Sequence, residues 1–201
     1  TKPLFVFHLS AQVRQKDSLR DIVCGLEQHE SKWYHIGIEK IKRSTISDAN
    51  NRVPYQVYEN LFYAMLKKCH NITQTTKFKF KNPLYALDSS IIDLCLSVFD
   101  WAKFRRAKGG IKLHSLFDLK TQIPTFNVIT TAKESDVKVA KQEAFPLIPD
   151  SIITFDRAYV DFKLFQSYQN AKVFFVTRAK DNLRFELLGQ QKIPKKKGLQ
   201  F

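Results

Sequence analysis

The segment Leu84-Tyr85-Ala86-Leu87-Asp88 is an apolar, strand-like run that ends in a carboxylate. Ile152-Ile153-Thr154-Phe155-Asp156 repeats the same pattern later in the chain. A carboxylate at the end of a strand buried on both faces is costly to keep ionised unless a cation lies against it. The two aspartates are 68 positions apart in the sequence. If they converge in the fold, they predict a divalent-metal site, because hard cations prefer oxygen ligands.

The order of the surrounding elements predicts how the aspartates meet. Sequential strands are followed by alternating helix and strand, which predicts an α/β fold with a mixed sheet flanked by helices. This is the ribonuclease H-like pattern, in which the first strand lies beside the later one that ends at Asp156. The expected strands are 84–88, 91–99, one within 111–119, 125–131, 151–156 and 173–176, with helices after Ser135 and near 160–169.

The sequence before this region has helical periodicity. Asp17 and Ser18 precede an apolar stripe that starts at Leu19, and Asp21 stands three residues after Ser18 as in a capping box. A second helix is expected from Pro54 to His70, and a short helix and turn between them. We therefore predict a small all-helical amino-terminal domain at residues 1–78 and the α/β domain at 79–201.

The chain is strongly basic. It has 33 Lys and Arg against 19 Asp and Glu, a formal charge of +14 and a pI near 9.7, which favours binding to phosphate. A ribosomal or membrane-surface protein would share that charge. No apolar run approaches the roughly 18 residues needed to span a bilayer, and no secretory signal is visible, so we expect a cytoplasmic protein without a membrane partner. The cysteine spacing does not match a zinc site, and no phosphate-cradling glycine loop is present.

The sequence also resembles DDE transposases of bacterial insertion sequences, the large group with a β-rich insertion in a ribonuclease H-like fold. Each motif is weak alone, but their order is specific. The amino-terminal part is similar to the helical domain that precedes the catalytic domain in one subset. The matching segments are Leu87-Asp88-Ser89-Ser90, Lys112-Leu113-His114, Asp118-Leu119, 124–130, Ser135-Asp136, Asp156-Arg157-Ala158-Tyr159 and 175–180 in the catalytic region, with 17–20, Ser44-Thr45, Ala49-Asn50 and Arg52 before it.

The resemblance implies a catalytic triad whose first two carboxylates are Asp88 and Asp156, with Mg²⁺ or Mn²⁺ as cofactor. The third carboxylate in the family is a Glu in a Tyr-x2-Arg-x3-Glu-x6-Lys motif beyond the insertion, and no such match exists here. The insertion is expected to start at about 183. Because the third carboxylate completes the shell of one ion, we expect weak metal binding and no turnover from this chain alone. Glu186 is an alternative third ligand, but its alternation with apolar neighbours favours a solvent-facing strand position. The resemblance further implies DNA as partner, both transposon ends and target, a homodimer in synapsis, and a nucleoid-associated bacterial protein.

Several basic residues are expected to contact DNA. Those in the stretch 101–110 mix with aromatic residues in a predicted hairpin tip, and others follow strand ends near the two aspartates. His114 is a candidate for contact with substrate or the metal shell, although a hydrogen-bonded structural role is favoured for a lone strand histidine. The predicted DNA-binding residues are Lys103, Arg105, Arg106, Lys108, Lys112, His114, Arg157, Arg178 and Lys180.

Two other functions fit the same residues. Another ribonuclease H-like nuclease, such as a junction resolvase, would share the paired aspartates and the metal. A non-catalytic DNA-binding module from a degenerate element would bind DNA without metal-dependent nicking. In the amino-terminal domain, segment 44–69 would either place a recognition helix in the major groove, pack beside the core, or aid dimerisation. The target site, the terminal repeats and the choice between hairpin and hydrolytic chemistry are not encoded in any motif.

Overall fold

The computed structural model describes residues 2–69, 80–94, 100–105, 108–143, 145–184, 186 and 189. The chain divides into two compact units, Thr1–Lys68 and Cys69–Phe201. The sequence prediction placed this boundary at 78, and residues 70–79 lie outside the described part of the chain. Each unit is therefore described by itself.

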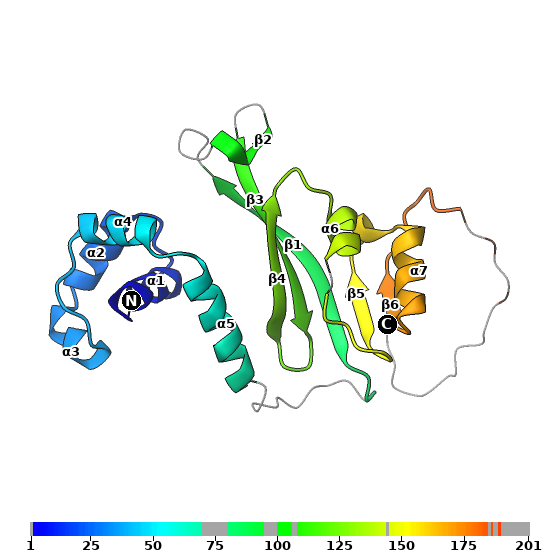
Figure 1. Cartoon of the computed structure of the whole chain (residues 1–201), viewed down its shortest axis with the longest axis horizontal. Coiled ribbons are helices and arrows are strands. Elements are labelled where there is room, and N and C mark those ends of the chain that lie inside the picture. The colour runs from blue at the N-terminus through cyan, green and yellow to red at the C-terminus, as the bar shows by residue number, and fades with distance from the viewer. Residues whose placement is uncertain are drawn as a thin grey trace. The chain divides into compact units, whose positions relative to one another are not determined.

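The first unit is all-helical, as predicted (Figure 1). Its core contains Phe7 and Ile46, which are almost fully buried, and Trp33, whose Nε1 donates a hydrogen bond to the Leu26 carbonyl at 2.9 Å. None of the described helices is long and apolar enough to cross a membrane. The elements are α1 (Lys2–Val13), α2 (Leu19–Glu27), the 3-10 turn η1 (Glu30–Lys32), α3 (Trp33–Ile36), α4 (Arg43–Arg52) and α5 (Gln56–Cys69).

The start of α2 confirms the predicted cap. The Ser18 hydroxyl oxygen accepts a hydrogen bond from the Asp21 backbone N–H at 3.1 Å, and the same hydroxyl donates to the Asp21 carboxylate at 2.6 Å. This satisfies one of the backbone donors that a helix leaves free at its first turn. The apolar residues of α2 then pack inward, with Ile22 and Leu26 buried.

Among the described residues, the second unit is built on a six-stranded mixed sheet with the order β2-β3-β1-β5-β6. β2 pairs with the start of β3, and β4 pairs with the rest of β3. β1 lies in the interior of the sheet, antiparallel to β3 and parallel to β5. This arrangement confirms the predicted ribonuclease H-like α/β fold. The strands are β1 (Leu84–Leu94), β2 (Lys103–Arg105), β3 (Lys108–Asp118), β4 (Ile123–Thr131), β5 (Ile152–Phe155) and β6 (Phe174–Thr177), with the 3-10 turn η2 (Asp100–Ala102) before β2.

One strand prediction was wrong in its bounds. Separate strands were expected at 84–88 and 91–99, but β1 runs without a break from Leu84 to Leu94. The polar residues between the two apolar runs do not end the strand, because β3 pairs with β1 along its whole length, from Tyr85↔Asp118 to Leu94↔Gly109. Residues 95–99 lie outside the described part of the chain.

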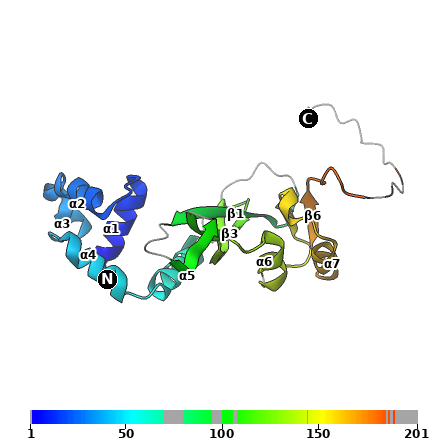
Figure 2. The same ribbon diagram turned by 90° about the horizontal axis from the view of Figure 1, so that it is seen from above.

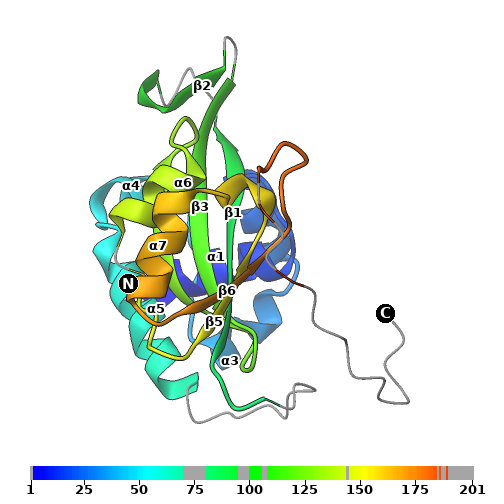
Figure 3. The ribbon, with the colours of Figure 1, turned by 90° about the vertical axis from the view of Figure 1, so that its right-hand side faces the viewer.

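The helices α6 (Asp136–Gln142) and α7 (Phe162–Asn170) lie on the same face of the sheet (Figures 2 and 3). The core is packed between them and the strands, and on β5 it takes alternate residues, Ile153 and Phe155. Because strand side chains alternate between faces, the intervening residues face the other side of the sheet. On β6 that other side carries the exposed Phe174 and Val176. The sheet thus has one helix-covered face and one open face among the described residues.

The cap of α2 gives a stability prediction. Ser18→Ala removes the side-chain acceptor for the Asp21 N–H, so we expect the helical unit to lose about 1 kcal/mol of unfolding free energy. Urea denaturation followed by circular dichroism measures the change. The control is Ser47→Ala, because Ser47 is exposed within α4 and does not cap that helix. Equal stability of the Ser18→Ala variant and the parent protein would contradict the capping role.

Candidate active site

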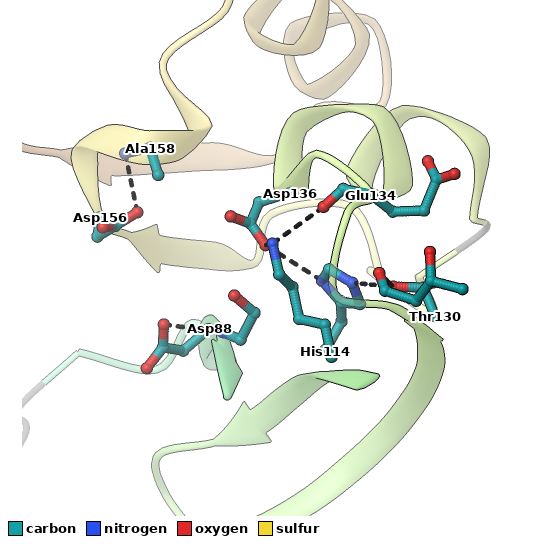
Figure 4. Close-up of polar contacts among 10 residues, drawn as sticks. Asp88, His114, Thr130, Glu134, Asp136, Asp156 and Ala158 are labelled. Carbon is teal, nitrogen blue, oxygen red and sulfur yellow. Dashed lines mark hydrogen bonds and ion pairs between the residues drawn. The ribbon is translucent and has the colours of Figure 1, made fainter. Parts of the chain in front are cut away.

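The parallel pairing of β1 with β5 brings the two aspartates together. The last paired residues are Leu87 and Phe155, and Asp88 and Asp156 come next on their respective strands. Leu87 and Phe155 are buried in the core under the helices. Since alternate residues face opposite sides, Asp88 and Asp156 both face the open side of the sheet. Figure 4 shows the two side chains, Asp88 within β1 and Asp156 just after β5.

Both carboxylates are exposed and each is held by one backbone hydrogen bond. Asp88 Oδ1 accepts from the Ser89 N–H at 2.8 Å. Asp156 Oδ1 accepts from the Ala158 N–H at 2.9 Å and caps the 3-10 turn η3 (Arg157–Tyr159). These bonds fix the carboxylates while leaving each Oδ2 without a hydrogen bond to any described residue.

The donor chemistry fits a hard divalent cation. Two carboxylates on neighbouring strands, Asp88 within β1 and Asp156 directly after β5, offer oxygen ligands of the kind that Mg²⁺ and Mn²⁺ prefer. Among the described residues no group of three or more His, Cys, Asp or Glu could hold a metal ion. Glu186, the alternative third ligand, is exposed. Asp88 and Asp156 would thus supply part of a metal shell, and water, substrate or a further carboxylate would complete it.

Some predicted DNA-binding residues lie next to Asp156. Arg157 and Lys180 line a cavity of about 470 Å³ together with Asp156. Arg157 lies 3.8 Å from the Asp181 carboxylate, and Lys180 Nζ donates to the Val160 carbonyl at 3.3 Å. Asp181 lines the cavity too, so two acidic and two basic side chains meet there. Arg178 is exposed. It directly follows Thr177, the last residue of β6, which pairs with Phe155. Arg178 therefore lies just past the end of β6, at the level of Asp156.

The other predicted DNA-binding residues fall into two groups. The first group comprises Lys103 and Arg105 of β2 and Lys108, the first residue of β3. The backbone of these three residues is described, but their side chains are not. Arg106 lies outside the described residues. Lys112 and His114 differ because they are buried on the helix-covered face, 8% and 1% exposed. A direct DNA contact requires a solvent-facing side chain, so their position favours the structural alternative.

Lys112 and His114 meet a carboxylate inside the fold. Lys112 Nζ lies 3.2 Å from Asp136 Oδ1 and donates to the Glu134 carbonyl at 2.9 Å. His114 Nδ1 lies 3.5 Å from the same Asp136 oxygen, and His114 Nε2 forms a hydrogen bond with Thr130 Oγ1 at 3.0 Å. These contacts join β3 to the start of α6 (Figure 4). Lys112, His114 and Asp136 are called the buried triad below.

Two family models match parts of this chain. Residues 79–200 match the family model described as "Transposase DDE domain". The chain belongs to the DDE transposase family. Residues 1–39 match a second family model, described as "Domain of unknown function (DUF4372)".

Two similar proteins are also transposases by name. The "Probable transposase for insertion sequence element IS5377" of Geobacillus stearothermophilus is 26% identical over 147 residues, which are 73% of this chain and 38% of that protein. The "Putative transposase y4zB" of Sinorhizobium fredii is 27% identical over 148 residues, 74% of this chain and 40% of that protein. This DDE transposase chain thus spans about two fifths of each relative's length.

Among solved structures, the piggyBac transposase synaptic complex with hairpin DNA is similar at 13% identity. Its TM-score is 0.40, and the match covers 72% of this chain and 34% of that chain.

Sequence reasoning missed several polar residues around the aspartates of this DDE transposase. Ser115 pairs with Asp88 and Asn127 pairs with Ser115, so the three share one row on the open face. The Ser115 hydroxyl donates to Asn127 Oδ1 at 2.7 Å. Asp136 was expected at the start of a helix and in a matching segment, but not as the partner of Lys112 and His114. The strand register identifies Ser115 and Asn127, and the register is not visible in one sequence.

Amide substitutions test the aspartate pair. Asp88→Asn and Asp156→Asn keep the Oδ1 acceptor of the backbone hydrogen bond and remove the negative charge, so we expect Mn²⁺ affinity to fall at least about tenfold with little loss of stability. Calorimetric titration with Mn²⁺ measures the affinity. The matched control is Asp181→Asn, an exposed carboxylate near Asp156. Equal Mn²⁺ affinity in all three variants would rule out the paired site.

His114 gives a pH prediction. Burial lowers the pKa of His114, Asp136 and Glu143 raise it in part, and Lys112 lowers it further. The unfolded chain, with an ordinary histidine pKa of about 6.5, binds the proton more readily than the folded chain, so this contribution to stability is lost as pH falls below that value. His114→Gln removes the titration. We expect urea denaturation to show a smaller loss of stability between about pH 7 and pH 5 for this variant, and equal losses would contradict the prediction.

Proposed function

We propose that this chain is the DNA-binding and partial catalytic region of an insertion-sequence transposase that cleaves and joins phosphodiester bonds at transposon ends with a divalent metal. The observation that carries the proposal is the in-register pairing of β1 with β5, which sets Asp88 beside Asp156 on one face of the sheet. Membership in the DDE transposase family supports the same function.

The chemistry follows from the site. Asp88 and Asp156 would hold Mg²⁺ or Mn²⁺, and such ions, when bound, lower the pKa of an attacking oxygen and neutralise the leaving oxygen. In cleavage, a water oxygen bonds to phosphorus and its proton leaves to solvent, while the bond from phosphorus to the 3′ oxygen breaks and that oxygen takes up a proton from solvent. In strand transfer, a 3′-hydroxyl takes the place of water. Arg157, Arg178 and Lys180 neutralise phosphates of the strand beside Asp156.

The helical unit would bind the transposon end. Residues 1–68 contain eleven Lys and Arg against seven Asp and Glu. In α4 only Ile46 is buried, while the polar and basic residues around it are exposed. Arg and Asn are the side chains that most often pair with base edges in the major groove, and α4 exposes Arg43, Asn51 and Arg52. Joining two ends into one complex requires at least two protomers.

This chain alone would be catalytically incomplete. Two carboxylates supply only part of the ligand set of a two-metal phosphoryl-transfer site, and the family resemblance assigns the third carboxylate to a later segment. The similar transposases are longer than this chain. A weak metal site and DNA binding without turnover are the properties expected of the 201 residues.

A nicking assay tests this function. We expect the 201-residue chain to bind end-bearing DNA with an affinity that falls steeply with salt, and to leave the DNA intact in Mg²⁺. A protein that carries this chain at the full length of its relatives is expected to nick the DNA in Mg²⁺ but not in EDTA. Asp88→Asn in that longer protein should abolish nicking and preserve binding.

Two outcomes would contradict the proposal. Nicking that persists after Asp88→Asn would place the chemistry elsewhere. Binding without nicking by the longer protein would favour the non-catalytic DNA-binding module instead.

A further inference from the structure

The buried triad is an unusual feature of the helix-covered face. Lys112 and His114 are 8% and 1% exposed, and the Asp136 side chain is 20% exposed. Burying charged groups is expensive, and a buried ion pair seldom stabilises a protein more than apolar residues of the same volume. Moreover, His114 Nδ1 and Asp136 Oδ1 have no well-formed hydrogen bond to any described residue. Stability alone does not account for this cluster.

The polar residues of the helix-covered face begin at the level of the two aspartates. On the helix-covered face, β1 and β3 form the apolar pair Leu87 and Leu116, both almost completely buried. The next pair on that face is Ser89 with His114, and Lys112 follows on β3. The change from apolar to polar therefore occurs at the level of Asp88, directly behind its carboxylate.

Ser89 and Tyr159 connect the buried triad to the aspartate pair. Ser89 follows Asp88 and pairs with His114. Tyr159 closes the turn that Asp156 caps, and its buried hydroxyl has no well-formed hydrogen bond to any described residue. Burial raises the pKa of Tyr159, and nearby Asp136 raises it more than Asp88 or Asp156 does, while Ser89 lowers it. Tyr159 also packs in one core cluster with Ala140 of α6, the helix that Asp136 begins, and η3 contacts α6.

We propose that Lys112, His114 and Asp136 are positioning residues that hold Ser89 and Tyr159 in place, and thereby fix the two segments that carry Asp88 and Asp156 for metal binding. This inference rests on the proposed function for its metal. Groups behind metal ligands commonly orient them, and their loss typically lowers metal affinity about 10- to 100-fold. The backbone N–H groups of Ser89 and Ala158, which donate to the two carboxylates, are the points where the buried triad would act.

Asp136→Asn tests the positioning role with two measurements. It keeps the side-chain shape and removes the charge that faces Lys112. We expect calorimetry to show Mn²⁺ binding about 10- to 100-fold weaker than in the parent protein. In metal-free protein we expect hydrogen exchange, followed by NMR, to be faster at the Ser89 and Ala158 amides. The Leu164 amide, which donates to Asp161, is the internal reference and should not change.

Glu134→Gln is the matched control. It removes the exposed pair between Glu134 and Lys138, 2.8 Å apart, which lies at the same end of α6. Since exposed pairs of this kind contribute little, Mn²⁺ affinity and amide exchange should match those of the parent protein. An equal effect of Glu134→Gln and Asp136→Asn would overturn the assignment to the buried triad.

A double variant separates positioning from folding. Lys112→Met with Asp136→Leu removes both charges together, a change that usually preserves the fold. We expect a folded protein with weak Mn²⁺ binding and fast exchange at the two amides. Parent-like Mn²⁺ affinity and parent-like exchange in this variant would overturn the proposal.

The two measurements also separate this inference from the proposed function. If the parent protein binds Mn²⁺ no better than Asp88→Asn while exchange at Ser89 and Ala158 still responds to Asp136→Asn, the metal function fails and the positioning role stands. If Mn²⁺ binding depends on Asp88 but neither measurement responds to Asp136→Asn, the positioning role fails and the metal function stands.

Discussion

The parallel pairing of β1 with β5 is the constraint on which the candidate site depends. It places Asp88, within β1, beside Asp156, which directly follows β5, with Leu87 opposite Phe155 immediately before them. A slip of one residue in this register would turn Asp156 toward the helix-covered face and separate the carboxylates. The buried Leu87, Ile153 and Phe155 oppose such a slip, because it would expose the apolar residues of β5. The core therefore specifies the site through the register.

The helix-covered face also determines the chemistry available on each side of the sheet. Aromatic packing, including Phe165 stacked on Phe175 with ring centroids 4.5 Å apart, fixes α7 against β6. The open face keeps the paired aspartates and the row of Ser115 and Asn127 accessible. A nucleic-acid strand is a large ligand, so an accessible face beside the carboxylates suits it better than an enclosed pocket would.

Local patterns in the sequence predicted much of this fold. The Ser18 cap, the strand that ends at Asp156 and the position of β1 beside β5 follow from periodicity, capping residues and the order of elements, and the structure confirms them. The burial of Lys112 and His114 could not be predicted in this way, since it depends on Asp136 more than twenty positions later. The continuous β1 was missed for the same reason, because its pairing with β3 overrides the polar break at Ser89 and Ser90.

The structure distinguishes the exposed aspartates Asp88 and Asp156 from the partly buried Asp136, and the sequence alone does not. Asp88 and Asp156 are exposed on the open face. Asp136 is partly buried, and its contact with the Lys112 cation at 3.2 Å offsets the cost of taking its charge out of water. In the proposed positioning role, the buried triad lies behind Ser89 and Tyr159 and would act on the backbone groups that donate to Asp88 and Asp156. Arg157 and Lys180 already line the cavity beside Asp156. Because Lys112 is buried on the helix-covered face, the buried triad would support the site without adding a further positive side chain at the carboxylates.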